Sequence, residues 1–76
     1  MATYYIIKEL RQKDTDTKIS FEMSSKLPHD SYRTWSGCWR KDFVGKHSDY
    51  TLIIHDNLKD ALDCLKESIQ ELNDNQ

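Results

Sequence analysis

The sequence predicts one small α+β domain, residues 1–76, in which an antiparallel sheet of three to four strands is covered by one C-terminal amphipathic helix. Three observations lead to this prediction: aromatic and β-branched residues near the start, strict apolar–polar alternation in the next segment, and apolar residues at helical spacing in the last third. A lone hairpin is marginal in water, so the helix is expected to bury its apolar side on the sheet. A domain of this size buries only about 60% of the surface that its unfolded chain exposes, which leaves no room for a closed active site.

Two strands are predicted in the first third of the chain. Residues 3–11 are rich in aromatic and β-branched side chains, and residues 18–23 alternate between polar and apolar ones. Residues 14–17 are short polar residues that hydrogen-bond their own backbone in turns, which predicts an antiparallel hairpin. Because the first segment is apolar on both faces between Tyr4 and Ile7, we expect it in the centre of the sheet.

The middle of the chain is less regular. Residues 24–30 contain the only proline, Pro28, and are predicted to be a connection. A short third strand is expected at residues 35–40, and a further strand at residues 50–54, which ends at His55.

The last third predicts a helix between Asp56 and Asp74. Asn57, with Asp60 three residues later, approximates a capping box, so Asp56 or Asn57 is expected to cap the helix. At about 100° per residue, five apolar residues cluster along one line and six carboxylates cluster opposite to it. The apolar residues are Leu58, Leu62, Leu65, Ile69 and Leu72, and the carboxylates are Asp56, Asp60, Asp63, Glu67, Glu71 and Asp74.

A second flank of this helix has only small side chains, those of Ala61, Cys64 and Ser68. Small residues at this spacing are expected to let another segment approach closely. Packing on the chain's own sheet is favoured over homodimerisation through this flank and the leucine line, because two heptads are short for a coiled coil. Both a monomer and a homodimer stay open.

Composition excludes several classes of protein. With 37% apolar and 32% charged residues, the chain is typical of a globular domain, and it has no apolar run long enough for a membrane span. Residues 1–10 are interrupted by Lys8 and Glu9 and lack the cleavage pattern of a signal peptide. We therefore expect no membrane contact and a cytoplasmic location, in the cytoplasm of a host if the source is a virus.

No catalytic residue, cofactor or metal site is predicted. The three histidines lie in different segments, and the chain has no Gly-x-Ser-x-Gly motif and no glycine-rich phosphate loop. Five residues are of metal-ligating type, but they lack standard metal-site spacing: Cys38, His47, Asp49, His55 and Cys64. For the two cysteines, free buried thiols are favoured over a disulfide or a reactive thiol.

The carboxylate row is the feature that indicates a partner. Residues 32–55 contain four basic and two acidic side chains, whereas residues 56–76 contain two basic and six acidic ones. The helix dipole disfavours Glu71 near the helix end, and like charges four residues apart, such as Asp63 and Glu67, cost roughly 0.2–0.5 kcal/mol per pair. The row spans about 27 Å, a length that suits a basic groove which normally holds nucleic acid. An ordinary solvated helix face is the alternative.

We therefore predict a non-enzymatic module, an inhibitor or regulator, that binds a basic surface of a larger protein. The acidic residues predicted to make this contact are Asp60, Asp63, Glu67 and Glu71. Exposed residues of the segment 35–41 are expected to add aromatic and cationic contacts.

Residues 32–46 interleave aromatic rings with cations, which is typical of platforms for single-stranded nucleic acid. The same residue types are enriched at protein-interface hot spots, and tryptophans also fill small cores. Binding of single-stranded nucleic acid is therefore the alternative function. The residues assigned to either contact are Arg33, Trp35, Trp39, Arg40 and Lys41.

Two resemblances accompany these predictions. Residues 56–69, with the segment from Tyr4 to Lys8 and the Gly37-Cys38 step, resemble HicB-type antitoxins, and this resemblance implies an antitoxin function. The predicted strand at residues 50–54 departs from that pattern. As a small α+β domain with an acidic face, the chain is also similar in kind to phage-encoded inhibitors of bacterial defence systems, including anti-CRISPR proteins.

Overall fold

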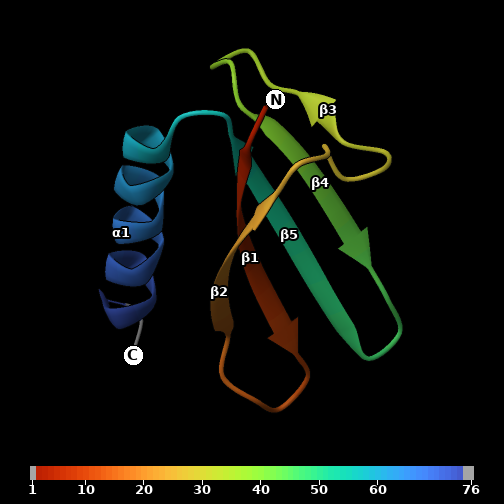
Figure 1. Ribbon diagram of the computed structural model, residues 1–76. Coiled ribbons are helices and arrows are strands. Elements are labelled where there is room, and N and C mark those ends of the chain that lie inside the picture. The colour runs from red at the N-terminus through yellow and green to blue at the C-terminus, as the bar shows by residue number, and fades with distance from the viewer. Residues whose placement is uncertain (1, 75–76) are drawn as a thin grey trace.

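The computed structural model describes residues 2–74, which form a five-stranded antiparallel sheet with one helix packed on one face (Figure 1). The sheet order is β2-β1-β5-β4-β3. This confirms the predicted α+β class and the single C-terminal helix, but the sheet has five strands rather than three to four. The elements are β1 (Tyr4–Gln12), β2 (Lys18–Ser24), β3 (Tyr32–Arg33), β4 (Trp39–Val44), β5 (Ser48–His55) and α1 (Leu58–Asp74).

Strand β1 lies inside the sheet, as its apolar character on both faces predicts. It pairs with β2 on one side and with β5 on the other. Ile6 and Ile7 point to opposite faces and are both buried. The predicted hairpin between β1 and β2 is present, and Asp14 in its turn has a positive φ of 66°. The first and last strands of the chain are therefore neighbours at the centre of the sheet.

The strand expected at residues 35–40 is wrong in position. Residues 34–38 form a turn, in which the Gly37 amide donates to the Thr34 carbonyl oxygen at 3.1 Å, and Gly37 has a φ of 97°. Glycine tolerates this backbone conformation without steric cost. The turn joins β3 to β4, which begins only at Trp39. Strand β3 has two residues, too few to display the period-two pattern on which a sequence prediction depends.

Helix α1 packs on the sheet through its small residues. Ala61 and Ser68 are buried, whereas Leu58, Leu62 and Ile69 keep 47%, 49% and 44% of their surface exposed. Leu62 follows Ala61 and Ile69 follows Ser68, so the exposed residues lie about 100° around the helix from the buried ones. The expectation that the whole leucine line would face the sheet is therefore wrong. The expected close approach along the small flank is confirmed, because small side chains let the helix lie near the strands.

The start of the helix agrees with its predicted cap. The Asp60 amide donates to the side-chain oxygen of Asn57 at 3.2 Å, and the Ala61 amide donates to the Asn57 carbonyl oxygen at 3.0 Å. The Asn57 side chain thus satisfies one of the amides that the first helical turn leaves without partners, and its carbonyl accepts the first regular hydrogen bond of the helix. The helix is neither long nor apolar enough to cross a membrane, and within residues 2–74 it is the only helix.

Asp42 ties three neighbouring strands together. Its carboxylate accepts hydrogen bonds from Arg40 Nε at 3.0 Å, from the Thr51 hydroxyl at 2.9 Å and from the Tyr32 hydroxyl at 3.0 Å. The Thr51 hydroxyl also accepts a bond from the guanidinium of Arg11 at 2.8 Å. The hydrogen bond from Arg40 is the main reason that the pKa of Asp42 is lowered, and the bonds from Thr51 and Tyr32 act in the same direction.

Replacing Ala61 with Leu is expected to lower the free energy of unfolding by about 1–3 kcal/mol, because a larger side chain must push the helix away from the sheet. The matched control is Gln70→Leu, which adds an apolar residue of the same kind on an exposed side of the helix. We expect the control to change stability by less than about 0.5 kcal/mol. Urea denaturation followed by circular dichroism measures both, and equal losses would contradict the packing described above.

Asp42→Asn is expected to destabilise the protein at neutral pH and to matter less in acid. The folded-state pKa of Asp42 lies below its unfolded value, so its stabilising contribution is present above the unfolded pKa and is lost as the pH falls through the folded pKa. The urea midpoints of wild type and variant are measured at about pH 7 and at about pH 3. The difference between wild type and variant should be larger at the higher pH. A difference that does not shrink in acid would show that the charge of Asp42 is irrelevant.

Candidate functional site

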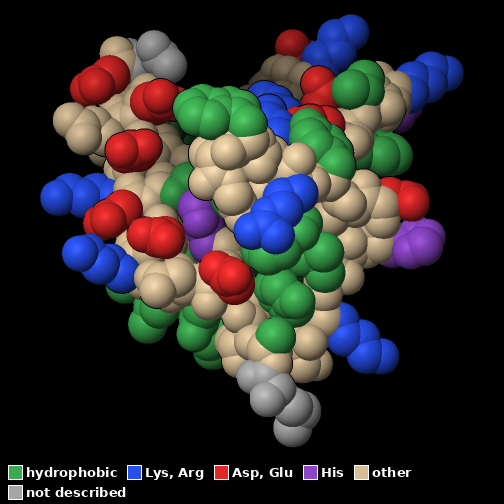
Figure 2. Space-filling view, turned by 90° about the horizontal axis from the view of Figure 1, so that it is seen from above, with side chains coloured by type: hydrophobic (Ala, Val, Ile, Leu, Met, Phe, Trp, Pro, Cys, Tyr) green, Lys and Arg blue, Asp and Glu red, His purple; other side chains and the backbone are tan. Residues whose placement is uncertain are grey.

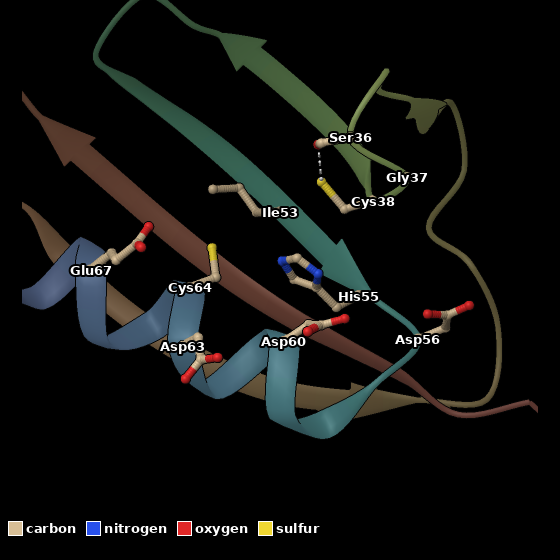
Figure 3. Close-up of a pocket in the computed structure, with 10 residues that line it drawn as sticks. All are labelled: Ser36, Gly37, Cys38, Ile53, His55, Asp56, Asp60, Asp63, Cys64 and Glu67. Atoms are coloured by element: carbon tan, nitrogen blue, oxygen red, sulfur yellow. Dashed lines mark hydrogen bonds between the residues drawn. The ribbon is translucent and has the colours of Figure 1, made fainter.

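The acidic face, which we define as Asp60, Asp63, Glu67 and Glu71, lies on the flank of α1 that looks toward β4. Its first three residues line a hollow of about 510 Å³ between the helix and the sheet (Figure 3). The opposite wall comes from Ile53 of β5 and from the turn before β4. The full lining is Ser36, Gly37, Cys38, Ile53, His55, Asp56, Asp60, Asp63, Cys64 and Glu67.

The four carboxylates of the acidic face form no ion pair with any cation among the described residues. Within residues 2–74, the ion pairs are Arg11 with Glu9, His29 with Asp30, and Arg40 with Asp42. All four residues of the acidic face are exposed, and Figure 2 shows acidic side chains gathered over the helix side of the molecule. The repulsion between carboxylates four residues apart is therefore not relieved by ion pairing within the described chain.

Beneath the acidic face, the hollow contains two thiols and an imidazole. Cys38 and Cys64 are free, and their side chains point into the hollow from the turn before β4 and from the helix (Figure 3). Burial raises the pKa of the Cys64 thiol, and the nearby Cys38 and Glu67 raise it further. The Nε2 atom of His55 is buried without a hydrogen-bond partner in the described chain. The two thiols are half-buried rather than fully buried, and no disulfide joins them.

The set of metal-ligating residues is only partly brought together. Cys38, His55 and Cys64 share the hollow, whereas His47 and Asp49 line a separate depression at the far end of the sheet. Across residues 2–74, no group of three or more His, Cys, Asp or Glu side chains has an arrangement that could hold a metal ion. The residues that sequence analysis did not join to the acidic face are the thiols and His55. In the sequence, only the residue types of Cys38, Cys64 and His55 marked them as candidates for a functional site.

A second, smaller hollow of about 260 Å³ continues along the same flank of the helix. Glu67 and Glu71 border it from the helix, while Arg40 and Glu9 border it from the sheet. Arg40 is therefore near the acidic face, but its guanidinium is hydrogen-bonded to Asp42 at 3.0 Å and 3.3 Å. The helix flank and β4 thus form a continuous furrow with carboxylates along its outer wall.

Three of the other residues predicted to make contacts, Arg33, Trp39 and Lys41, lie on the sheet face without the helix, which we call the open face. Trp39 pairs with Arg33 and Ile54, and Lys41 pairs with Leu52, so the register places their side chains opposite to those of Arg40 and Asp42. The Arg33 guanidinium lies over the Trp39 ring at 5.0 Å. The predicted contact residues are therefore divided between two faces of the sheet.

Trp35 belongs to neither face. It lies in the turn between β3 and β4, and 99% of its surface is exposed. It contributes nothing to the core, whereas Trp39 is half-buried and packs edge-on against Tyr4 at 5.7 Å between ring centroids. The two tryptophans, four residues apart in the sequence, thus have entirely different surroundings.

Comparison with known protein families, with characterised proteins and with solved structures finds no match for this chain. The resemblance of residues 56–69 to HicB-type antitoxins therefore stays a prediction. Any function has to be argued from the surfaces described above.

Proposed function

We propose that the protein is a non-enzymatic binding module that docks its acidic face on a basic, nucleic-acid-binding surface of a larger protein. The observation that supports this proposal is a row of four exposed carboxylates without ion-pair partners in the described chain, beside a hollow that can admit a side chain. The effect on the partner would be inhibition, in the manner of anti-CRISPR proteins and other phage-type anti-defence proteins, because carboxylates would occupy the places of phosphates.

The charge arrangement favours a cationic partner over a neutral one. Asp63, Glu67 and Glu71 follow one another at intervals of four residues, and each such pair of like charges costs roughly 0.2–0.5 kcal/mol in the free protein. A partner that supplies arginine or lysine removes this repulsion and adds attraction. Complementary charge of this kind also accelerates association, and its effect falls as salt screens the charges.

The hollow gives the docking face a shape as well as a charge. Its volume of about 510 Å³ can accept a lysine or arginine side chain. Asp60 and Glu67 stand at its helix wall, where they can meet the charged end of such a side chain, whereas the Asp63 carboxylate points away from the sheet (Figure 3). Ile53 offers apolar surface for the methylene groups of the same side chain, since long basic residues bury their stems on apolar atoms.

Removing the charges of the acidic face without changing its shape is expected to abolish capture of the partner. The variant carries Asp60→Asn, Asp63→Asn, Glu67→Gln and Glu71→Gln, and the control on the same helix carries Lys59→Gln and Lys66→Gln. Immobilised wild type and both variants are incubated with extract of the source or host cell, and captured proteins are quantified by mass spectrometry. We expect a nucleic-acid-binding protein that the wild type and the control retain, that the charge-neutral variant loses, and that added nucleic acid displaces.

Equal capture by wild type and the charge-neutral variant would refute docking through the acidic face. Circular dichroism of both variants accompanies the experiment, because loss of binding counts only if the helix remains folded.

The open face supports a second candidate, binding of single-stranded nucleic acid. The register aligns Lys8, Leu52 and Lys41 in one row across three strands, and it aligns Leu10, Tyr50 and Phe43 in the next. Cations thus alternate with rings on one surface, and 46% of the Phe43 surface is exposed. Such surfaces bind single strands by stacking bases on rings while cations meet phosphates.

The internal contacts of these rings weaken this second candidate. Tyr50 is stacked on Phe43 at 5.0 Å and has the Lys8 ammonium at 4.9 Å from its ring centroid. The Trp39 ring is likewise covered by Arg33. A base that stacks on Tyr50 or Trp39 has to displace a cation first, so the acidic face remains the preferred assignment.

If the open face binds nucleic acid, Lys8→Gln with Lys41→Gln is expected to weaken binding of a single-stranded oligonucleotide at about 50 mM salt and to lower the salt slope by about 1.4. The control, Lys59→Gln with Lys66→Gln, removes the same charge from the helix and should leave the slope unchanged. Fluorescence anisotropy with a labelled oligonucleotide measures both. Absence of any binding by the wild type would eliminate this function.

A further inference from the structure

Strand β2 is a full-length edge strand of the sheet. It pairs with β1 on one side, and within residues 2–74 no strand pairs with its other side. The opposite edge is formed by β3, which has only two residues and offers little backbone for pairing. Strand β2 has seven residues and no proline, so it presents a row of backbone donors and acceptors to a further strand.

The apolar residues that the helix leaves exposed lie on the same side of the molecule as this edge. The acidic face borders the hollows toward β4, so Leu58, Leu62 and Ile69 occupy the other flank of α1. The helix contacts β2, β1 and β5, but among the described elements it does not contact β4. Met23 of β2 is also 67% exposed and points to the helix side of the sheet.

This arrangement leaves an apolar strip next to an open edge. Figure 1 shows α1 and β2 at the same side of the molecule, and Figure 2 shows hydrophobic and acidic side chains on different flanks of the helix. Exposed apolar residues beside unpaired backbone form the kind of surface on which another chain can pack.

We propose that the occupant is a second copy of this chain, joined by antiparallel pairing of β2 with itself around Ser20. Directly opposite residues of antiparallel strands share a face. In this register, Lys18 lies opposite Glu22 of the second copy on the open face, and the same pair recurs on the other side of the two-fold axis. On the helix face, Ile19 lies opposite Phe21 of the second copy, again twice.

The side chains of β2 favour this register over its neighbours. If the centre of the pairing moves to Ile19 or to Phe21, Lys18 no longer lies opposite Glu22 of the second copy. Opposite charges and apolar–aromatic contacts across antiparallel strands contribute roughly 0.2–1 kcal/mol each, and the two-fold axis doubles every one of them. Pairing centred on Ser20 therefore places Lys18 opposite Glu22 and, in the same register, Ile19 opposite Phe21.

The same two-fold axis places both helices on one side of the joined sheet. The two β1 strands are then three strand spacings apart, roughly 14 Å, and the helices face each other across a valley. Its walls are Leu58, Leu62 and Ile69 of both copies, and its floor is the Ile19 and Phe21 pairs. Asp60, Asp63 and Glu67 line the hollow on the other flank of each helix, so the dimer presents these carboxylates of both copies outward and remains compatible with the docking proposed above.

Sedimentation equilibrium of the full chain over a range of concentrations tests this dimer. The wild type is expected to reach a species of twice the 9.0 kDa chain mass. Lys18→Glu and Glu22→Lys each place like charges opposite one another and should raise the dissociation constant by about 10-fold. The double variant, Lys18→Glu with Glu22→Lys, restores opposite charges and should return the dissociation constant to near the wild-type value.

Both residues are exposed, so these substitutions leave the core of each copy intact. A wild type that stays monomeric at millimolar concentration would overturn the proposal. The proposal would also be overturned if the single variants left the dissociation constant of the dimer unchanged, or if the double variant failed to restore it. Either result would place the interface elsewhere. Leu62→Ser with Ile69→Ser provides an independent check, since it should weaken the dimer without unfolding the helix.

Discussion

The arrangement of the whole surface depends on how one helix rests on the sheet. Ala61 and Ser68 are the contact points, and their small side chains let α1 settle close to the central strands. This packing contact fixes the rotation of the helix about its axis. With the small residues turned inward, Asp60, Asp63 and Glu67 lie along the furrow beside β4, and the exposed Leu58, Leu62 and Ile69 lie on the other flank. A helix held by its leucines instead would have turned its carboxylates away from the sheet altogether.

The sheet separates the charges of the chain into two regions. The helix side carries the carboxylates of the acidic face, while the open face carries Lys8, Lys41 and Arg33 among aromatic rings. A net charge of −2 conceals this separation, because the two regions nearly cancel in the sum. The molecule is therefore dipolar across the thickness of its sheet. A cationic partner is attracted to one side of it and repelled by the other, which restricts how the two can approach.

Local patterns in the sequence predicted those parts of the fold that depend on neighbouring residues. The β1–β2 hairpin, the internal position of β1 and the Asn57 cap follow from turn chemistry, apolar content and capping preference. The two-residue β3 has no such pattern, and the start of β4 depends on the Gly37 turn. The rotation of α1 was predicted incorrectly, because hydrophobicity points to the leucines while the available space favours alanine and serine. The acidic face could be predicted as a helical row. The position of this face beside Cys38 and His55 could not be predicted, because it depends on which strands become neighbours in the sheet.

The pairing of β1 with β5 at the centre of the sheet also governs how the chain folds. Tyr5 is paired with His55 and Ile7 with Ile53, so the interior strand contacts are made between residues some forty or more positions apart. Pairing between residues so far apart forms slowly, because a long loop must close before any contact compensates for the chain entropy that its closure costs. The β1–β2 hairpin can form early, but Ile7 stays uncovered until β5 and the helix arrive. During synthesis, the domain therefore acquires its core only after β5 and α1 have left the ribosome, and a product that lacks these elements exposes the central strand.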